Sequence, residues 1–265
     1  MNRNIEFIKE KCIGCFKCRQ VCPFNVIEYI EGKPRLNPNK ICLKCMHCAA
    51  ICPVGAVSYD GKNAVVNDEF PELTKEFPDL LEAHLMKRRS YRHFKAEPVN
   101  RESLEHALKI ACWAPSAKNE HPTKYVIVDK KETIDKIMKI ILSFAEKHHE
   151  LDIIVKEYQE GNNPIMGNAP TLLLAYAPNH SINPIGDTTL KLYTAELILQ
   201  SKGIGSCWAG YLTRLSNSIP ELKELFDLPE GNSFVGALML GYPDHKVEQY
   251  DTIPERIKKQ DIKWL

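Results

Sequence analysis

Eight of the ten cysteines in this 265-residue chain stand in two runs with identical spacing. Residues 12–23 read CIGCFKCRQVCP and residues 42–53 read CLKCMHCAAICP, so each run follows C-x2-C-x2-C-x3-C-P. The second run repeats the first thirty positions later and in register, as expected of one structural unit used twice. Thiols at this density can bind metal, close disulfides or pack as small apolar side chains.

The spacing of the cysteines discriminates among these chemistries. A disulfide framework suits a small secreted protein, but residues 1–11 (MNRNIEFIKEK) are polar and show no signal-peptide core. Structural zinc is commonly bound by two C-x2-C pairs. The third cysteine of each run, with a fourth before the proline, gives one ligand too many for that tetrahedral arrangement. Two [4Fe-4S] clusters fit, because each needs four thiolates and the fourth cysteine of such a run binds the other cluster. The expected ligand sets are Cys12, Cys15, Cys18 and Cys52 for one cluster and Cys42, Cys45, Cys48 and Cys22 for the other.

Residues 1 to about 62 resemble a bacterial two-cluster ferredoxin, complete in all eight ligands. The resemblance implies a small pseudo-twofold domain with short strands before and after each cysteine run. The stretches VIEYIEGKPRLN (26–37) and AVSYDGKNAVVN (56–67) are the expected hairpins, turning at Gly32 and Gly61.

The chain is expected to divide near residue 67, where acidic residues and two prolines interrupt any core pattern. We expect a ferredoxin domain over 1–66, a linker over 67–78 and a second domain over 79–265. The formal net charge of +1 gives no global field that attracts nucleic acid or membrane. No apolar run approaches the roughly twenty residues of a membrane span. Oxygen-sensitive clusters and free thiols indicate a reducing cytoplasm.

Beyond the linker, apolar periodicity predicts helices alternating with strands, in an α+β or mixed α/β order. One helix, 187–202, is predicted to begin at a cap on Asp187, to end at Gly203 and to be apolar on most faces. A helix that is apolar all round is buried, here between two subunits. The other predicted helices cover 80–90, 101–114 and 132–150, and the predicted strands cover 124–129, 171–177 and 233–243.

The stretch KRRSYRHFK (87–95) concentrates positive charge. Arg88, Ser90 and Arg92 place two guanidiniums and a hydroxyl within five positions, which is the chemistry that binds a phosphate. A solvated basic helix end is the alternative interpretation.

Three further segments carry weaker signals. In APSAKNEHP (114–122) small residues allow a backbone to approach a planar ligand, and Asn119 can donate and accept; an ordinary loop is the alternative. The Gly-rich GIGSCWAG (203–210) offers backbone amides but lacks the strand-then-helix context of a dinucleotide fingerprint. A late IPER places Arg256 near the end of the sequence.

In this order the four segments resemble the nitroreductase family of FMN-dependent oxidoreductases, over about residues 79–265. The family's R-x-S-x-R/K motif binds the FMN phosphate together with a late arginine. Its A-P-S-x-x-N-x-Q-P-W loop lines the flavin of the partner subunit, and its Gly-rich stretch lies near the reactive flavin nitrogen. His121 and Thr123 depart from the loop pattern, where glutamine and tryptophan are usual. The resemblance implies FMN binding by Arg88, Arg89, Ser90, Arg92, Pro115, Ser116, Ala117, Asn119, Trp208, Ala209, Gly210 and Arg256.

The resemblance further implies an α+β flavin sandwich and an obligate homodimer with two FMN sites at its interface. Iron–sulfur clusters carry single electrons, whereas flavin accepts one or two and can deliver a hydride. The expected reaction passes electrons from a low-potential donor, such as an external ferredoxin, through two [4Fe-4S] clusters to FMN. An organic acceptor such as a nitroaromatic or quinone is then reduced. No catalytic acid–base pair is recognisable in the sequence.

Two other functions stay open at this point. The chain could be a relay subunit that reduces a partner protein, or a flavin enzyme of narrower chemistry such as dehalogenation or flavin fragmentation. No dinucleotide fingerprint indicates direct binding of NAD(P)H.

Overall fold

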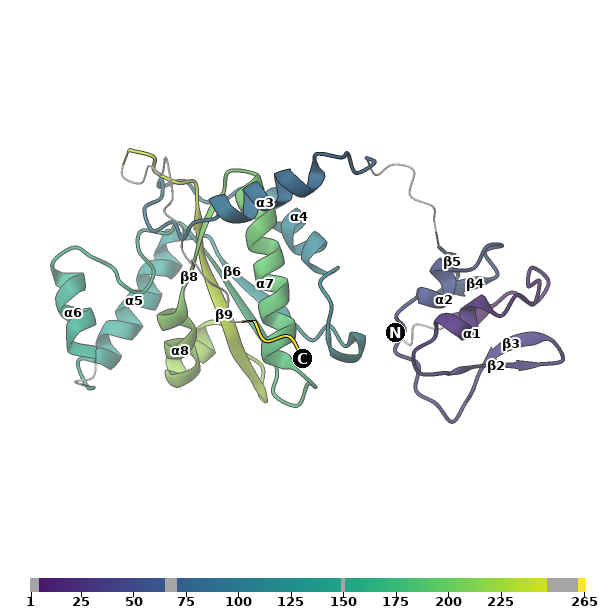
Figure 1. The fold of residues 1–265 in the computed structure, drawn as a ribbon. Helices are drawn as coiled ribbons and strands as arrows, with labels where there is room; N and C mark the ends of the chain where they lie inside the picture. The colour runs from purple at the N-terminus through teal and green to yellow at the C-terminus, as the bar shows by residue number, and fades with distance from the viewer. Residues whose placement is uncertain (1–4, 65–70, 149–150, 247–261) are drawn as a thin grey trace. The chain divides into compact units, whose positions relative to one another are not determined.

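The computed structural model of the chain describes residues 5–64, 71–148, 151–246 and 262–265. It contains two compact units (Figure 1). The first comprises Met1–Pro78 with Ser116–Glu120, and the second comprises Asp79–Pro115 and His121–Leu265. Within the described ranges, no helix combines the length and the apolar character needed to cross a bilayer.

Short antiparallel strands flank both cysteine runs of the N-terminal unit, as the hairpin patterns predict. The first hairpin joins β2 (Ile27–Ile30) to β3 (Lys33–Leu36) through Gly32, whose φ is 77°. A second sheet has the order β1-β4-β5. Its strands are β1 (Ile5–Phe7), β4 (Val57–Tyr59) and β5 (Lys62–Asn63), with Gly61 at φ 73° in the turn.

The internal repeat of the sequence is also a repeat of backbone conformation. Each cysteine run carries one short helix, α1 (Lys17–Val21) or α2 (His47–Ala50). Both helices follow a residue with left-handed backbone, Phe16 at φ 62° and Met46 at φ 65°. L-residues with side chains seldom adopt this conformation, so its recurrence thirty positions apart shows that the two halves fold alike.

The second unit is built on a four-stranded antiparallel sheet of order β6-β7-β9-β8. Successive side chains of a strand face opposite sides of a sheet, and both faces of β7 are buried. Leu172 and Leu174 pack with helices α5, α8 and α9, whereas Leu173 and Ala175 pack with α4 and α7. The strands are β6 (Lys124–Val128), β7 (Thr171–Pro178), β8 (Gly205–Trp208) and β9 (Asn232–Gly241).

Helices cover both faces of this sheet, which gives the α+β sandwich that the resemblance implies (Figure 1). The helices are α3 (Phe77–Lys87), α4 (Arg101–Ala111), α5 (Lys131–Ala145), α6 (Asp152–Gln159), α7 (Pro184–Ser201), α8 (Gly210–Ser218) and α9 (Pro220–Leu225), with a 3-10 turn at Ala117–Asn119.

Three sequence expectations need correction. Helix α7 begins at Pro184, and its cap is Asn183, whose side chain accepts from the Gly186 amide at 3.2 Å, rather than Asp187. Its buried face is also not uniformly apolar, as described below. Residues 205–208, expected to offer free backbone amides, form strand β8 and pair with β9. Helices α6, α8 and α9 were not anticipated by the periodicity.

Candidate functional site

Two cavities in the N-terminal unit are each lined by four cysteines. The first cavity is lined by Cys12, Cys15, Cys18 and Cys52, and the second by Cys22, Cys42, Cys45 and Cys48. The fourth cysteine of each run thus lies with the three earlier cysteines of the other run. These are the two ligand sets expected from the spacing, and none of these thiols is in a disulfide.

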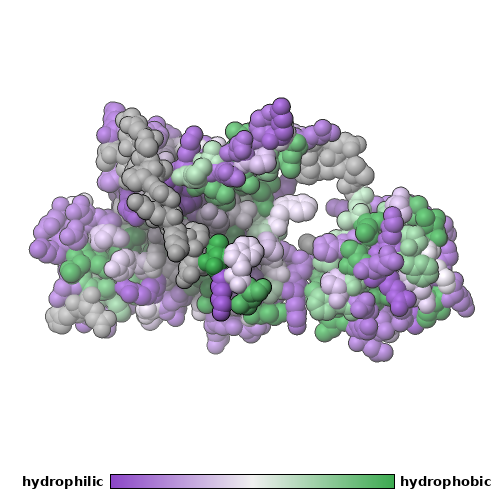
Figure 2. Space-filling view, in the orientation of Figure 1, coloured by the Kyte–Doolittle hydropathy of each residue, from purple (hydrophilic) through white to green (hydrophobic). Residues whose placement is uncertain are grey.

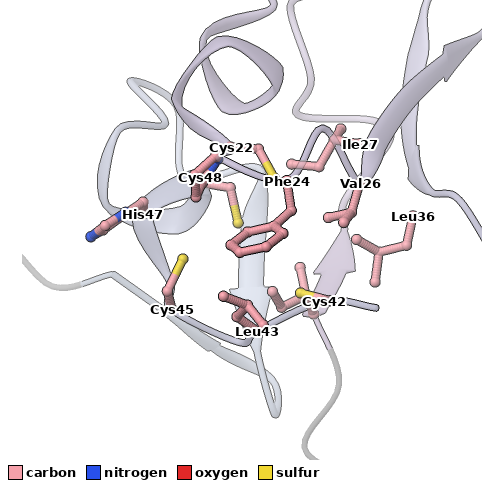
Figure 3. Close-up of a pocket in the computed structure, with 12 residues that line it drawn as sticks. Cys22, Phe24, Val26, Ile27, Leu36, Cys42, Leu43, Cys45, His47 and Cys48 are labelled. Carbon is pink, nitrogen blue, oxygen red and sulfur yellow. The ribbon is translucent and has the colours of Figure 1, made fainter. Parts of the chain in front are cut away.

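The second cavity is otherwise apolar. Phe24, Val26 and Leu43 lie around its cysteines, while the ring of His47 turns away from the sulfur atoms (Figure 3). Burial raises the pKa of the Cys48 thiol to about 11. A cation is therefore needed to hold this sulfur as a thiolate at neutral pH.

The first cavity contains a polar side chain near its sulfur atoms. The hydroxyl of Tyr29 lies 3.3 Å from the Sγ of Cys18, and the Tyr29 ring packs on Phe16 with centroids 4.2 Å apart. Burial and the nearby sulfurs hold the pKa of Tyr29 above its ordinary value, so the hydroxyl keeps its proton.

The cysteines of each cavity surround a volume rather than a point. Across the described residues, no three cysteine, histidine, aspartate or glutamate side chains converge as the ligands of a single metal ion would. A cubane takes one thiolate at each of four irons, so four separated sulfurs fit its donor set.

Apolar side chains shield both cavities. Green and purple surfaces alternate on the visible face of the N-terminal unit (Figure 2). Its exposed large apolar residues include Ile13 and Val54, which line the first cavity, and Phe24, which lines the second. An apolar shell limits water access to a cluster and so influences its potential.

In the second unit, the basic segment after α3 lies along the edge strand β8. Ser90 bridges to Ser206, and the Tyr91 amide donates to the Ser206 carbonyl at 2.9 Å. Phe94 is buried against Gly241, where an added Cβ would lie 2.8 Å from the Phe94 ring. Glycine therefore sets how closely this segment packs on the sheet.

A buried carboxylate on α7 joins this segment to β8. Glu196 is fully buried, and its oxygens accept from Ser206 Oγ at 2.9 Å and from Trp208 Nε1 at 3.0 Å. Arg88 Nη1 lies 3.5 Å from Glu196 Oε1, with the Arg88 side chain 19% exposed. Gln200, one turn later, donates to the Arg89 carbonyl at 2.9 Å and to Ser206 Oγ at 2.7 Å. The network thus connects two of the segments expected to bind FMN.

A basic cavity of about 280 Å³ lies beside Arg88. Lys87, Arg88, His84 and His245 contribute to its lining, and none of the described residues that line it carries a carboxylate. This donor set fits an anion such as a phosphate group. Ser90 and Arg92 do not line the cavity, and Arg92 is exposed. Arg89 is buried and donates to the Met86 carbonyl at 3.0 Å, at the end of α3.

The remaining expected FMN residues are distributed over other places. Trp208 ends β8 and is 36% exposed, and Gly210 begins α8. The Ala209 amide is already bonded to the Ala237 carbonyl at 2.8 Å, so it is not available to a flavin. Pro115 is exposed at the end of one stretch of the second unit, whereas Ser116, Ala117 and Asn119 group with the first unit. Arg256 lies outside the described residues.

The positions that depart from the family loop pattern adjoin a buried polar cluster. Thr123 Oγ1 and Thr188 Oγ1 are 3.1 Å apart. Burial lowers the pKa of His121, and the nearby Lys191 lowers it further, whereas Asp187 opposes the shift. Burial likewise lowers the pKa of Lys191, which is 3% exposed. Glu196 and Lys191 were not among the residues expected from the sequence, although both place a charge on an otherwise apolar helix.

The chain matches two family models. The nitroreductase family model matches residues 85–242, and a 4Fe-4S dicluster domain model matches residues 11–57.

Curated relatives agree with the first match. An iodotyrosine deiodinase of Nematostella vectensis is 26% identical over 200 residues, covering 68% of this chain and 74% of that protein. A putative NADH dehydrogenase/NAD(P)H nitroreductase of Archaeoglobus fulgidus is 27% identical over 186 residues, covering 67% of this chain and 94% of that protein.

Solved structures share the fold of the second unit. A nitroreductase with bound FMN from Bacteroides fragilis has a TM-score of 0.57 at 17% identity, over 69% of this chain and 98% of that one. An iodotyrosine deiodinase bound to FMN and 3-iodo-L-tyrosine has a TM-score of 0.52 at 23% identity, over 69% of this chain and all of that one. The chain therefore belongs to the nitroreductase family of FMN-dependent oxidoreductases and carries a 4Fe-4S dicluster ferredoxin domain at its N-terminus.

Proposed function

We propose that the protein passes electrons from a low-potential donor through two [4Fe-4S] clusters to FMN and on to an organic acceptor, such as a nitroaromatic or quinone. The observation that carries this proposal is the pair of four-cysteine cavities in a chain that also has the nitroreductase fold. A nitroreductase that took hydride directly from a nicotinamide would have no use for one-electron carriers.

The two cysteine sets support a specific ligand assignment. One cluster is held at the first cavity by Cys12, Cys15, Cys18 and Cys52, and the other at the second cavity by Cys22, Cys42, Cys45 and Cys48. Each cluster then ties the two cysteine runs together, so loss of one cluster weakens the packing of both halves.

The basic cavity supports the position of the FMN phosphate. Arg88 and Lys87 would hold the phosphate there by charge-assisted contacts. Bound FMN supplies the ability to accept one or two electrons and to deliver a hydride. Trp208, fixed by its bond to the buried Glu196, would present a rigid apolar wall to the flavin.

We further propose that the active form is a homodimer with FMN at the interface. Family members are typically dimers. Helix α7 keeps Ile185, Leu190 and Tyr193 exposed on its outer side, although its other side is buried. A second subunit would remove this apolar surface from water.

Reductive dehalogenation is a second candidate, because several curated relatives are iodotyrosine deiodinases. A deiodinase would prefer halogenated phenols to nitroaromatics and quinones as acceptors. Steady-state rates with all three acceptor classes, under a chemically reduced one-electron donor, separate the two functions.

Anaerobic iron and flavin analysis tests the cofactor content. We expect about eight iron atoms and one FMN for each chain, since each cubane has four irons. Zinc in place of iron, or four irons only, would refute the two-cluster assignment. Faster acceptor reduction with NADH than with a one-electron donor would contradict the electron path.

A further inference from the structure

The two halves of the N-terminal unit repeat each other, but the polar groups beside the two cysteine sets differ. Residues thirty positions apart occupy equivalent places in the two halves. Each residue near the first cavity can therefore be compared with the residue thirty positions later near the second cavity.

The first difference is a hydroxyl. Tyr29 places its hydroxyl 3.3 Å from Cys18 Sγ, and a thiolate has no proton, so the hydroxyl donates once the sulfur is a ligand. The counterpart of Tyr29 is Tyr59, which does not line the second cavity. Ile5, paired with Tyr59 in the sheet, lines it instead. Among the described residues that line the second cavity, none has a hydroxyl group.

The second difference is positive charge. Lys33 Nζ donates to the carbonyl oxygen of Cys12 at 2.9 Å, whereas its counterpart is the neutral Asn63. Lys17 lines the first cavity, and its counterpart is His47, whose ring turns away from the second cysteine set (Figure 3). These two positions place more positive charge beside the first cavity, whereas Lys44, between Cys42 and Cys45 of the second set, has the neutral Gly14 as its counterpart. The charge difference therefore runs in both directions, and the asymmetry depends mainly on the Tyr29 hydroxyl.

Backbone donors do not offset this asymmetry. The Ala56 amide donates to Cys52 Sγ at 3.2 Å, beside the first cavity. The Lys44 amide donates to Cys42 Sγ at 3.4 Å, beside the second. Each cavity thus receives a bond of this kind, and the Tyr29 hydroxyl is an addition on one side.

We propose that the cluster at the first cavity has the higher reduction potential, and that the Tyr29 hydroxyl is a principal cause. This inference rests on the two-cluster function proposed above. Reduction adds one negative charge to a cluster, so a donor to its thiolate and a nearby cation stabilise the reduced form more than the oxidised form. One electron passes from the cluster at the second cavity, which is oxidised by one, to the cluster at the first, which is reduced by one. No bond or proton changes in that step.

A redox titration of the full-length protein, followed by electron paramagnetic resonance, tests the proposal. Tyr29→Phe keeps the ring on Phe16 and removes only the hydroxyl. We expect it to shift the equilibrium of the higher-potential cluster about tenfold toward the oxidised form, which is 59 mV for a one-electron couple. The lower-potential cluster should keep its potential. Tyr59→Phe is the matched control and should move neither cluster.

A second readout excludes an indirect structural effect. The reduced wild-type protein should show exchangeable protons from both the Tyr29 hydroxyl and the Ala56 amide coupled to the higher-potential cluster in electron–nuclear double resonance, and Tyr29→Phe should lose only the hydroxyl proton. Lys33→Met should lower the same potential while keeping that proton signal. Equal potentials in the wild type, or a Tyr29→Phe shift in the lower-potential cluster, would overturn the proposal. Iron content well below eight atoms for each wild-type chain would refute the two-cluster function itself.

Discussion

The pair of Arg88 and Glu196 allows a test that separates phosphate binding from fold stability. Arg88 lines the basic cavity, but its guanidinium also faces a carboxylate whose side chain is 1% exposed. A simple alanine substitution would mix two effects. It would remove the proposed contact to the FMN phosphate and leave a buried charge without its cation.

The expected loss of stability follows from the contacts of Glu196. An uncompensated buried charge costs roughly 3 to 5 kcal/mol. Ser206 and Trp208 still donate to the carboxylate, and the Arg88 contact is long at 3.5 Å, so we expect about 3 kcal/mol for Arg88→Met, the lower end of that range. Glu196→Gln removes the charge but turns its amide NH2 group toward one of the donors. We expect this change to lower the free energy of unfolding by about 1 to 2 kcal/mol.

The double substitution then distinguishes the two roles. Arg88→Met/Glu196→Gln should be more stable than the sum of its single changes predicts, by about 1 to 3 kcal/mol, because no buried charge remains unpaired. Its affinity for FMN should stay at least tenfold below that of the wild type, since the lost phosphate contact is worth about 1.5 to 3 kcal/mol. Glu196→Gln alone keeps Arg88 and should keep most of the affinity.

The assay combines urea unfolding of flavin-free protein with fluorescence titration of FMN. Flavin must be absent from the unfolding experiment, because a ligand of the folded state raises apparent stability. Arg92→Ala is the control for stability, since Arg92 is exposed and should change it by less than about 0.5 kcal/mol. If the double variant recovered FMN affinity together with stability, Arg88 would serve only as the counter-charge of Glu196. Unchanged stability in Arg88→Met would refute the buried-pair argument.

Three further outcomes are expected. Cys22→Ser should disturb the cluster at the second cavity and Cys52→Ser the one at the first; Mössbauer spectra with the opposite pattern would reverse the ligand assignment. A chain beginning at Asp79 should still bind FMN and sediment as a dimer but lose turnover with one-electron donors, and equal donor-driven rates would show that the clusters are dispensable. Because burial lowers the folded-state pKa of Lys191, the folded chain binds fewer protons than the unfolded one below the ordinary lysine pKa of about 10.4. The free energy of unfolding of the wild type should therefore increase with pH toward that value more steeply than that of Lys191→Met. Unfolding free energies that change in the same way for both proteins from pH 7 to 10 would contradict the lowered pKa of Lys191.

The grouping of the eight cysteines around two cavities was predictable, because it depends on local spacing. A fixed C-x2-C-x2-C-x3-C-P run sets the backbone within about ten residues, and the repeat supplies the partner for each fourth cysteine. The hairpin turns at Gly32 and Gly61 were predictable for a similar reason, since both need positive φ within a short stretch.

The polar groups of α7 were harder to predict, because their role depends on distant partners. The helical periodicity of apolar residues shows which positions of 187–202 share a face of the helix. It does not show that Glu196 contacts Arg88 and Trp208, which are distant in the sequence. The same limit applies to strand β8. Its sequence GSCW combines glycine and serine, which give weak strand signals, and its pairing with β9 decides its structure.

The number of clusters matters for the chemistry of the flavin. A hydride transfer to an organic acceptor consumes two electrons, whereas each cubane releases one. Two clusters on one chain can therefore store the full requirement of one turnover, and a single cluster cannot. If the two potentials were equal, the first electron would be shared between both sites. Under the proposal above, the Tyr29 hydroxyl and Lys33 beside the first cavity would give the two electrons an order, with the first at the cavity of Cys18 and the second more strongly reducing. Tyr29→Phe should narrow the difference between the reduction potentials of the two clusters. The second electron would then exceed the first in reducing strength by less than in the wild type.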